Sequence, residues 1–141
     1  MILVSGGTGF VGSSAVRELL RRGERPAVLG RDPVKIRERF DDRVDARPGN
    51  VREPDTLTAA MAGADIVINA VQFPHSPIEN RRKGWTFEEI DLKGTRHQVD
   101  AAKAAGVRRF VYVSGVGAAK DAGKHWFRFK WEAEEYLKQS G

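Results

Sequence analysis

The sequence predicts an α/β protein in which helices cover both faces of a doubly wound parallel sheet of about five strands. Three observations support this prediction. The short apolar run Met1–Val4 is followed at once by glycines spaced G-x-x-G-x-x-G, a pattern typical of a strand, a tight turn and a helix. Strand-like and helix-like patterns then alternate five times, and right-handed crossovers turn this alternation into a parallel sheet. The length of 141 residues suits a single domain, residues 1–141.

Each glycine of the first turn has a separate expected role. We expect Gly6 to adopt a positive φ, Gly9 to let the backbone approach a phosphate, and Gly12 to let the next helix pack against the strand. The helix that begins near Phe10 then presents unpaired N–H groups and a partial positive charge to an anion. The turn therefore predicts a Rossmann domain that binds the pyrophosphate of a dinucleotide at the carboxyl edge of its sheet.

In the first half of the chain, apolar spacing and stop residues define each element. Leu19 and Leu20 end an apolar stripe with helical spacing, and Gly23 closes that helix. Asp32-Pro33 begins the second helix, because proline fits the first helical turn. The third strand is weaker and ends at a Pro-Gly pair. The expected elements are strands over 1–4, 26–30 and 44–47 and helices over 10–22, 33–40 and 54–62.

The second half contains the clearest strand of the sequence. Residues 64–71 are apolar, β-branched and nearly unbroken, as in a strand buried on both faces. Residues 72–84 hold two prolines and the basic cluster Arg81–Lys83 without periodicity, so we expect a mobile loop. The remaining expected elements are a long helix over 85–105 ended by Gly106, a strand over 107–113 and a helix over 126–139.

The composition excludes several classes of function. The net charge is +5, but most basic residues are interleaved with acidic ones, so we expect no nucleic-acid surface and an attraction for an anionic cofactor instead. There is no cysteine, and His75, His97 and His125 lie far apart in the sequence, so we expect no metal site. No apolar run approaches the roughly 20 residues of a membrane span, and no basic leader precedes the first strand. These features predict a cytoplasmic protein without a membrane segment.

A set of short motifs runs in order across nearly the whole chain. They are Gly6–Gly12, Gly30–Pro33, Gly49–Pro54, Ala64–Ala70, Asp91–Thr95, Ala101–Val107, Phe110–Gly115 and Lys130–Glu134. In this order the motifs resemble the short-chain dehydrogenase/reductases, and in particular their extended and atypical branches, the NAD-dependent epimerase/dehydratases and the NmrA-like NAD(P)-binding proteins. The resemblance implies a Rossmann fold and a nicotinamide dinucleotide cofactor.

The resemblance also implies roles for individual positions. Those that match the family's cofactor site are Thr8, Gly9, Phe10 and Val11 at the pyrophosphate, Asn50 and Val51 at the adenine, Ala70 and Val71 at the nicotinamide-side ribose, and Lys130 at the ribose hydroxyls. The residues alone leave two alternatives open. In the first alternative the Asn50 side chain caps a turn and does not contact the adenine. In the second, Lys130 lies in solvent on the surface of a helix.

Two departures from the family pattern bear on catalysis. Family enzymes place a tyrosine four residues before the lysine, where this chain has Trp126, whose indole N–H cannot cycle a proton. The position of the family's catalytic serine or threonine falls at Gly115, so Ser114 and Lys130 are the only catalytic candidates. We therefore expect slow or absent turnover of aldehydes, ketones and quinones. Two functions stay open: an atypical oxidoreductase or epimerase with an unidentified small-molecule substrate, and a non-catalytic NADP(H)-sensing regulator or assembly factor.

The end of the second strand predicts NADP(H) rather than NAD(H). A site that prefers NAD places a carboxylate there, about 20 residues past the glycines. This chain has Gly30 and then Arg31, whose guanidinium can bind a 2′-phosphate through two hydrogen bonds. We expect Asp32 to cap the following helix instead of turning toward the ribose.

The region of the last helix suggests that the protein forms a homodimer and that the chain is part of a longer protein. Family members carry further strands after this point, so we expect the chain to be the N-terminal part of a longer protein. Aromatic residues gather near the start of the last helix, namely Trp126, Phe127, Phe129 and Trp131. Exposed aromatics of this kind mark interfaces, and they suggest a homodimer formed through the two long helices.

Overall fold

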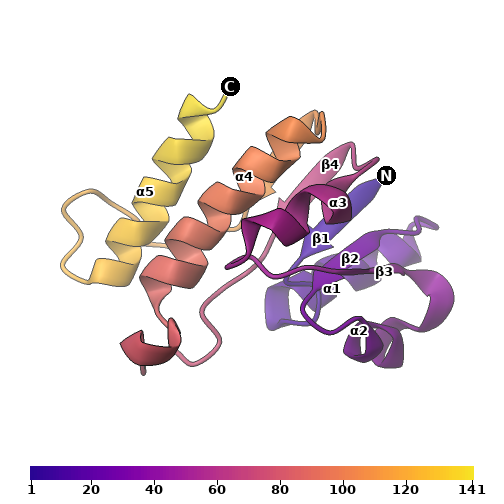
Figure 1. Cartoon of the computed structure of the whole chain (residues 1–141), viewed down its shortest axis with the longest axis horizontal. Coiled ribbons are helices and arrows are strands. Elements are labelled where there is room, and N and C mark those ends of the chain that lie inside the picture. The colour runs from indigo at the N-terminus through magenta and orange to yellow at the C-terminus, as the bar shows by residue number, and fades with distance from the viewer.

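A sheet of five parallel strands forms the centre of the molecule. In the computed structural model, which describes residues 1–141, the strand order is β3-β2-β1-β4-β5 (Figure 1). The strands are β1 Ile2–Ser5, β2 Ala27–Gly30, β3 Asp45–Pro48, β4 Ile66–Asn69 and β5 Arg109–Tyr112. The order reverses between β1 and β4, so the glycine turn after β1 opens at the switch point of the sheet. The predicted fold class is confirmed.

Different helices cover the two faces of this sheet. The helices are α1 Phe10–Arg21, α2 Pro33–Phe40, α3 Leu57–Met61, α4 Gly94–Ala104 and α5 His125–Gln139. Side chains alternate along each strand, so Val4 and Val28 pack under α1 and α2, whereas Leu3 and Val67 pack under α3 and α4. Helices α4 and α5 lie side by side (Figure 1). None of the helices combines the length and the apolar character needed to cross a membrane.

The predicted helix over 85–105 is wrong at its start. Trp85 pairs with Asn80 in an antiparallel bridge, and the two residues exchange backbone hydrogen bonds of 2.7 and 3.0 Å. The helix begins only after Thr86, whose hydroxyl accepts from the N–H of Glu89 at 3.1 Å. A π-helical segment, Glu88–Lys93, then leads into α4. The expected loop before it contains a 3₁₀ turn, Arg81–Lys83, because the Asn80 side chain caps that turn.

The aromatic residues of α5 pack partly inside the chain. Trp126 stacks on Phe87 with ring centroids 5.3 Å apart, and Trp126 and Phe129 both pack against the buried cluster of Phe73, Phe87 and Ile90. These contacts give the two side chains a role within the fold. The homodimer stays a prediction.

Candidate functional site

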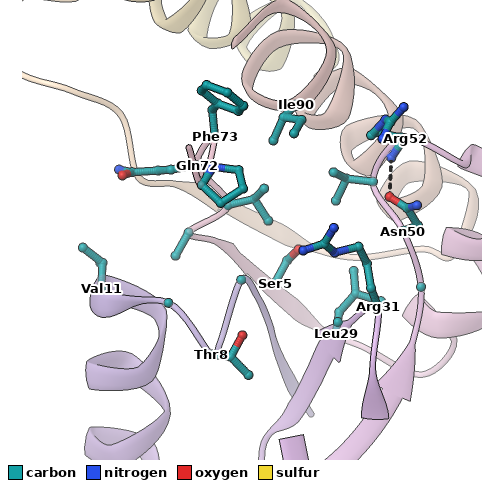
Figure 2. A pocket seen from close by; sticks show the side chains of 18 of the residues that line it. Ser5, Thr8, Val11, Leu29, Arg31, Asn50, Arg52, Gln72, Phe73 and Ile90 are labelled. Carbon is teal, nitrogen blue, oxygen red and sulfur yellow. Dashed lines mark hydrogen bonds between the residues drawn. The ribbon is translucent and has the colours of Figure 1, made fainter. Parts of the chain in front are cut away.

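A pocket of about 510 Å³ opens at the carboxyl ends of β1, β2 and β4, beside the glycine turn (Figure 2). It is bounded by the glycine turn, by the segments that follow β2 and β3, and by the segment that follows β4. The lining residues are Ser5, Gly6, Thr8, Gly9, Phe10, Val11, Leu29, Gly30, Arg31, Gly49, Asn50, Val51, Arg52, Ala70, Val71, Gln72, Phe73, Pro74, Trp85 and Ile90. The pocket thus brings together ten of the twelve residues that the sequence assigns to the cofactor, and leaves out Gly12 and Lys130.

The glycine turn leaves no room for side chains. Gly6 has a φ of +76°, as predicted, and a Cβ there would lie 2.8 Å from the backbone of Ala70. Gly12 lies behind the turn rather than in the pocket, and a Cβ on it would stand only 2.1 Å from the carbonyl oxygen of Gly6. Gly9 donates its backbone N–H to the carbonyl oxygen of Gly6 at 3.0 Å. The turn is therefore held in one shape by close backbone packing.

The turn presents polar groups that have no partner in the chain. Gly9 is the N-cap of α1 and supplies no side-chain cap, and the first turn of α1 contains no acidic residue. The Ser5 hydroxyl is buried without a hydrogen-bond partner, and Ser5 lines the pocket (Figure 2). A bare helix N-terminus attracts an anion, and a buried hydroxyl requires a polar partner. These groups fit the pyrophosphate and sugar oxygens of a dinucleotide.

Two arginines border the pocket near the ends of β2 and β3. Arg31 follows β2, Arg52 lies beyond β3, and their guanidinium carbons lie 5.0 and 5.1 Å from the ring centroid of Trp85. Arg52 also donates to the carbonyl oxygen of Lys83 at 2.8 Å. Asp32 does not approach the pocket, because its carboxylate caps α2 and accepts from the N–H of Val34 at 3.0 Å. The predicted cap is confirmed.

The Asn50 side chain is engaged within its own turn. It accepts from the N–H of Arg52 at 3.1 Å and donates to Glu53 Oε1 at 2.9 Å. The Asn50 side chain therefore caps its own turn, which is the alternative that the residues alone left open. Asn50 and Val51 nevertheless both line the pocket, and the Val51 carbonyl oxygen lies 2.7 Å from His97 Nδ1. This wall of the pocket is thereby tied to α4.

The segment after β4 is also held by buried side chains. Asn69 is fully buried, and its amide accepts from the N–H of Val71 and donates to Thr95 Oγ1, both at 3.0 Å. Asp91 accepts from the N–H of Phe73 at 2.9 Å. Ala70, Val71 and Phe73 therefore form a fixed wall of the pocket.

Lys130 is buried, which excludes the alternative of a lysine on a solvated helix surface. Its Nζ lies 2.8 Å from Asp91 Oδ1 and 5.4 Å from the centroid of the Tyr112 ring. Burial raises the pKa of the Asp91 carboxyl, while the Lys130 ammonium and the N–H of Phe73 oppose that rise. Neither residue of this ion pair lines the pocket. The role of Lys130 at the ribose stays a prediction.

No replacement for the missing tyrosine appears at the pocket. Trp126 stacks on Phe87, and the hydroxyl of Ser114 donates to Glu134 Oε1 rather than facing the pocket. Tyr112 is the tyrosine beside Lys130, but it does not line the pocket, and burial raises the pKa of its phenol, which makes it a weaker acid. The catalytic roles of Ser114 and Lys130 stay predictions.

Sequence reasoning missed four residues that shape the site. Ser5 and Arg52 had a signal in the sequence, because Ser5 ends β1 and Arg52 lies shortly after β3. Ligands bind at this carboxyl edge of a parallel sheet. Trp85 carries no such signal, because its place depends on the bridge to Asn80. Asp91 lies in a family-like motif, but its ion pair with Lys130 joins residues far apart in the sequence.

Comparison with known proteins agrees with this geometry. A family model described as NAD(P)H-binding matches residues 6–141. The chain is 37% identical to the NAD(P)H azoreductase of Xenophilus azovorans, with coverage of 100% of this chain and 44% of that protein. It is 30% identical to the photosystem II assembly factor Ycf39 of Cyanophora paradoxa, with coverage of 99% and 42%. The chain therefore spans under half the length of these relatives.

Solved structures share the fold. An NADPH-dependent quinone oxidoreductase from Escherichia coli, complexed with NADPH, matches with a TM-score of 0.80 over 100% of this chain and 46% of that one. The two sequences are 22% identical, so this likeness shows the fold alone. A candidate NAD-dependent epimerase/dehydratase from Bacillus halodurans matches with a TM-score of 0.83 at 27% identity, over 98% of this chain and 64% of that one. The motifs, the glycine turn and the matched residues agree, and the chain belongs to the NAD(P)H-binding family, with the Rossmann fold of the epimerase/dehydratase-like proteins.

Proposed function

We propose that this protein binds NADP(H) in preference to NAD(H). The observation that carries the proposal is the charge of the pocket lining, in which Arg31 and Arg52 are the only ionisable side chains. A 2′-phosphate is a strong acceptor for guanidinium donors, whereas the free ribose of NAD is normally held by a carboxylate. The nearest candidate carboxylate, Asp32, is engaged in capping α2.

The remaining lining residues support an extended cofactor along the carboxyl edge. Gly6, Thr8, Gly9, Phe10 and Val11 surround the proposed pyrophosphate position, where the N-terminus of α1 adds its partial positive charge. Further along the pocket we assign Asn50 and Val51 to the adenine and Ala70 and Val71 to the nicotinamide-side ribose. When bound, the cofactor supplies a hydride from its nicotinamide ring.

Replacement of Arg31 tests the cofactor preference. Arg31→Ala is expected to weaken NADPH binding by roughly 10- to 100-fold and NADH binding by less than about twofold, because only NADPH carries the phosphate that the guanidinium contacts. Isothermal titration with both cofactors measures the two losses. Arg37→Ala removes an equal charge from an exposed position of α2 outside the pocket and is the matched control. Equal losses for NADPH and NADH would contradict the assignment.

We further propose that the reaction is the reduction of quinones, which departs from the slow or absent quinone turnover expected from the sequence. The pocket contains no carboxylate, histidine, lysine or tyrosine that could donate a proton. Hydride addition to a ketone leaves a strongly basic alkoxide, and without a positioned acid that step loses roughly 10²- to 10⁴-fold in rate. Hydride addition to a quinone leaves an aromatic oxyanion, comparable to a phenolate with a pKa near 10, which water protonates afterwards. The similarity to an NAD(P)H azoreductase supports a reductase function.

A panel of acceptors tests this proposal. We expect kcat/KM for a quinone to exceed that for an aldehyde of similar size by about 100-fold, because only the aldehyde needs a protein acid. Trp126→Phe, which keeps a ring against Phe87, should leave the ratio unchanged. Rapid aldehyde reduction that disappears in Lys130→Ala would instead identify a conventional reductase that uses Lys130.

A second candidate function is a non-catalytic NADP(H)-sensing regulator or assembly factor. The lack of a proton donor in the pocket and the similarity to a photosystem II assembly factor favour it. Tight NADPH binding without hydride transfer to any acceptor of the panel would select this function. The homodimer and the cytoplasmic location are likewise proposals.

A further inference from the structure

A second cavity lies on the face of the sheet that α1 and α2 cover. Its volume is about 560 Å³, and it shares no lining residue with the cofactor pocket. We call it the arginine pocket, after the five arginines among its nine lining residues. Those residues are Arg17, Leu20, Arg21, Gly23, Glu24, Arg25, Arg39, Phe40 and Arg43.

Three of the five guanidinium groups of the arginine pocket have no carboxylate partner. Arg21 pairs with Glu18 and Arg43 with Asp41, whereas Arg17, Arg25 and Arg39 have no carboxylate within 4.0 Å. Glu24 is the only acidic residue in the lining, and it forms no ion pair. Guanidinium groups of one sign around one hollow repel one another, and a bound anion removes that repulsion.

The three unpaired guanidinium groups are held in place by neutral acceptors. Arg39 donates to the Thr8 carbonyl oxygen at 2.9 Å, Arg25 to the Asp42 carbonyl oxygen at 3.3 Å, and Arg17 to Ser13 Oγ at 3.4 Å. Each guanidinium has five N–H donors, so these single bonds orient the groups and leave most donors free. A planar group with two free parallel donors suits the oxygens of a phosphate.

The same surface lacks what a nucleic acid requires. Phe40 is the only aromatic residue in the lining, and its side chain is buried, with the Arg39 guanidinium 5.9 Å from the ring. Base stacking needs an exposed ring, so the pocket offers contacts to phosphate and none to bases. We propose that the arginine pocket binds a small metabolite that carries two or more phosphate groups.

Arg39 links this pocket to the glycine turn. Thr8, whose carbonyl oxygen accepts from Arg39, lines the cofactor pocket. An anion that binds the free N–H donors of Arg39 fixes the guanidinium that supports the Thr8 carbonyl oxygen, and the turn in its cofactor-binding shape fixes Arg39 for the anion. The two sites are therefore coupled, and each ligand raises the affinity of the other by the same factor.

Inorganic pyrophosphate is the probe for this site. Calorimetric titration is performed at about 0.15 M salt, where contacts between distant exposed charges are screened, into protein that already carries one equivalent of NADPH. The double variant Arg17→Gln/Arg25→Gln should bind pyrophosphate at least tenfold more weakly than the parent. The control Arg109→Gln/Arg128→Gln removes two exposed arginines elsewhere and should change the affinity less than twofold.

Three outcomes would overturn the proposal. They are no pyrophosphate binding by the parent, equal weakening in the two double variants, and binding of a single-stranded oligonucleotide that depends on Arg17 and Arg25 and that pyrophosphate does not displace. Arg39→Gln tests the coupling separately, because the affinity for NADPH should then no longer depend on pyrophosphate. The result of the Arg31→Ala titration has no bearing on these comparisons, so failure of the cofactor assignment and failure of this site are distinguishable.

Discussion

Replacement of Lys130 by methionine is expected to lower the free energy of unfolding by about 3–5 kcal/mol at neutral pH. The side chain is buried, and its ammonium lies 2.8 Å from the carboxylate of Asp91, which is 2% exposed. Methionine preserves most of the volume but leaves the carboxylate without its cation. Urea denaturation at pH 7 measures the loss. Lys138→Met, which breaks an exposed pair with Glu135, should lower the unfolding free energy by less than about 1 kcal/mol.

The loss in Lys130→Met should depend on pH in a defined direction. Burial raises the pKa of Asp91 above its value in the unfolded chain, so the folded protein binds more protons than the unfolded one. The free energy of unfolding therefore falls as the pH rises through the interval between the two pKa values. Removal of the ammonium raises the folded-state pKa further, so the deficit is largest at neutral pH and shrinks toward about pH 4, where the carboxyl is protonated.

A second replacement separates lost charge from lost packing. Lys130→Met combined with Asp91→Asn removes both charges, and we expect it to recover at least half of the stability lost in the single variant. Asparagine can still accept from the N–H of Phe73, the contact that holds the pocket wall. A deficit that is the same at pH 4 and pH 7, or a double variant no more stable than the single one, would show that the ion pair contributes little.

The fold could be predicted because its determinants are local in the sequence. The three glycines, the Asp32-Pro33 cap and the β-branched run before Val71 each specify a neighbouring element without reference to the rest of the chain. The third strand, expected over 44–47, is observed over Asp45–Pro48. The alternation of these elements then indicates a parallel sheet, since parallel strands require crossovers of one hand. It does not specify the observed order, β3-β2-β1-β4-β5.

The parts of the site that could not be predicted depend on contacts between distant residues. Trp85 has helix-like neighbours in the sequence, but its backbone pairs with Asn80 and its ring lies against Arg31 and Arg52. Lys130 lies near Glu132 and Glu134 in the sequence, yet its partner in space is Asp91, from a segment about forty residues earlier. Helical spacing alone gives no signal for either contact. The contacts of Trp85 depend on how the segment after β4 packs against the residues that follow β2 and β3, and the ion pair of Lys130 depends on how Asp91 packs against α5.

The second large expected effect is on NADPH binding, and it comes from a substitution in the glycine turn. Gly12→Ala is expected to weaken NADPH binding by more than about 100-fold, or roughly 2.7 kcal/mol. An added Cβ would stand 2.1 Å from Gly6 O and 2.9 Å from Gly7 Cα, and these are backbone atoms that cannot rotate away. Either the turn or the start of α1 must move, and both displace the N–H groups proposed for the pyrophosphate.

The opposite end of the same helix supplies the control for Gly12→Ala. Gly23 follows α1 with a φ of +79° and open space around its Cβ position, so Gly23→Ala is strained but meets no neighbour. We expect Gly23→Ala to lower stability by about 1 kcal/mol and to leave NADPH affinity within twofold of the parent. Fluorescence titration of NADPH, with circular dichroism to verify folding, compares the two variants. If Gly12→Ala folds and binds NADPH within threefold of the parent, the pyrophosphate does not lie on this turn, because no shift that accommodates the methyl group leaves the N–H groups in place.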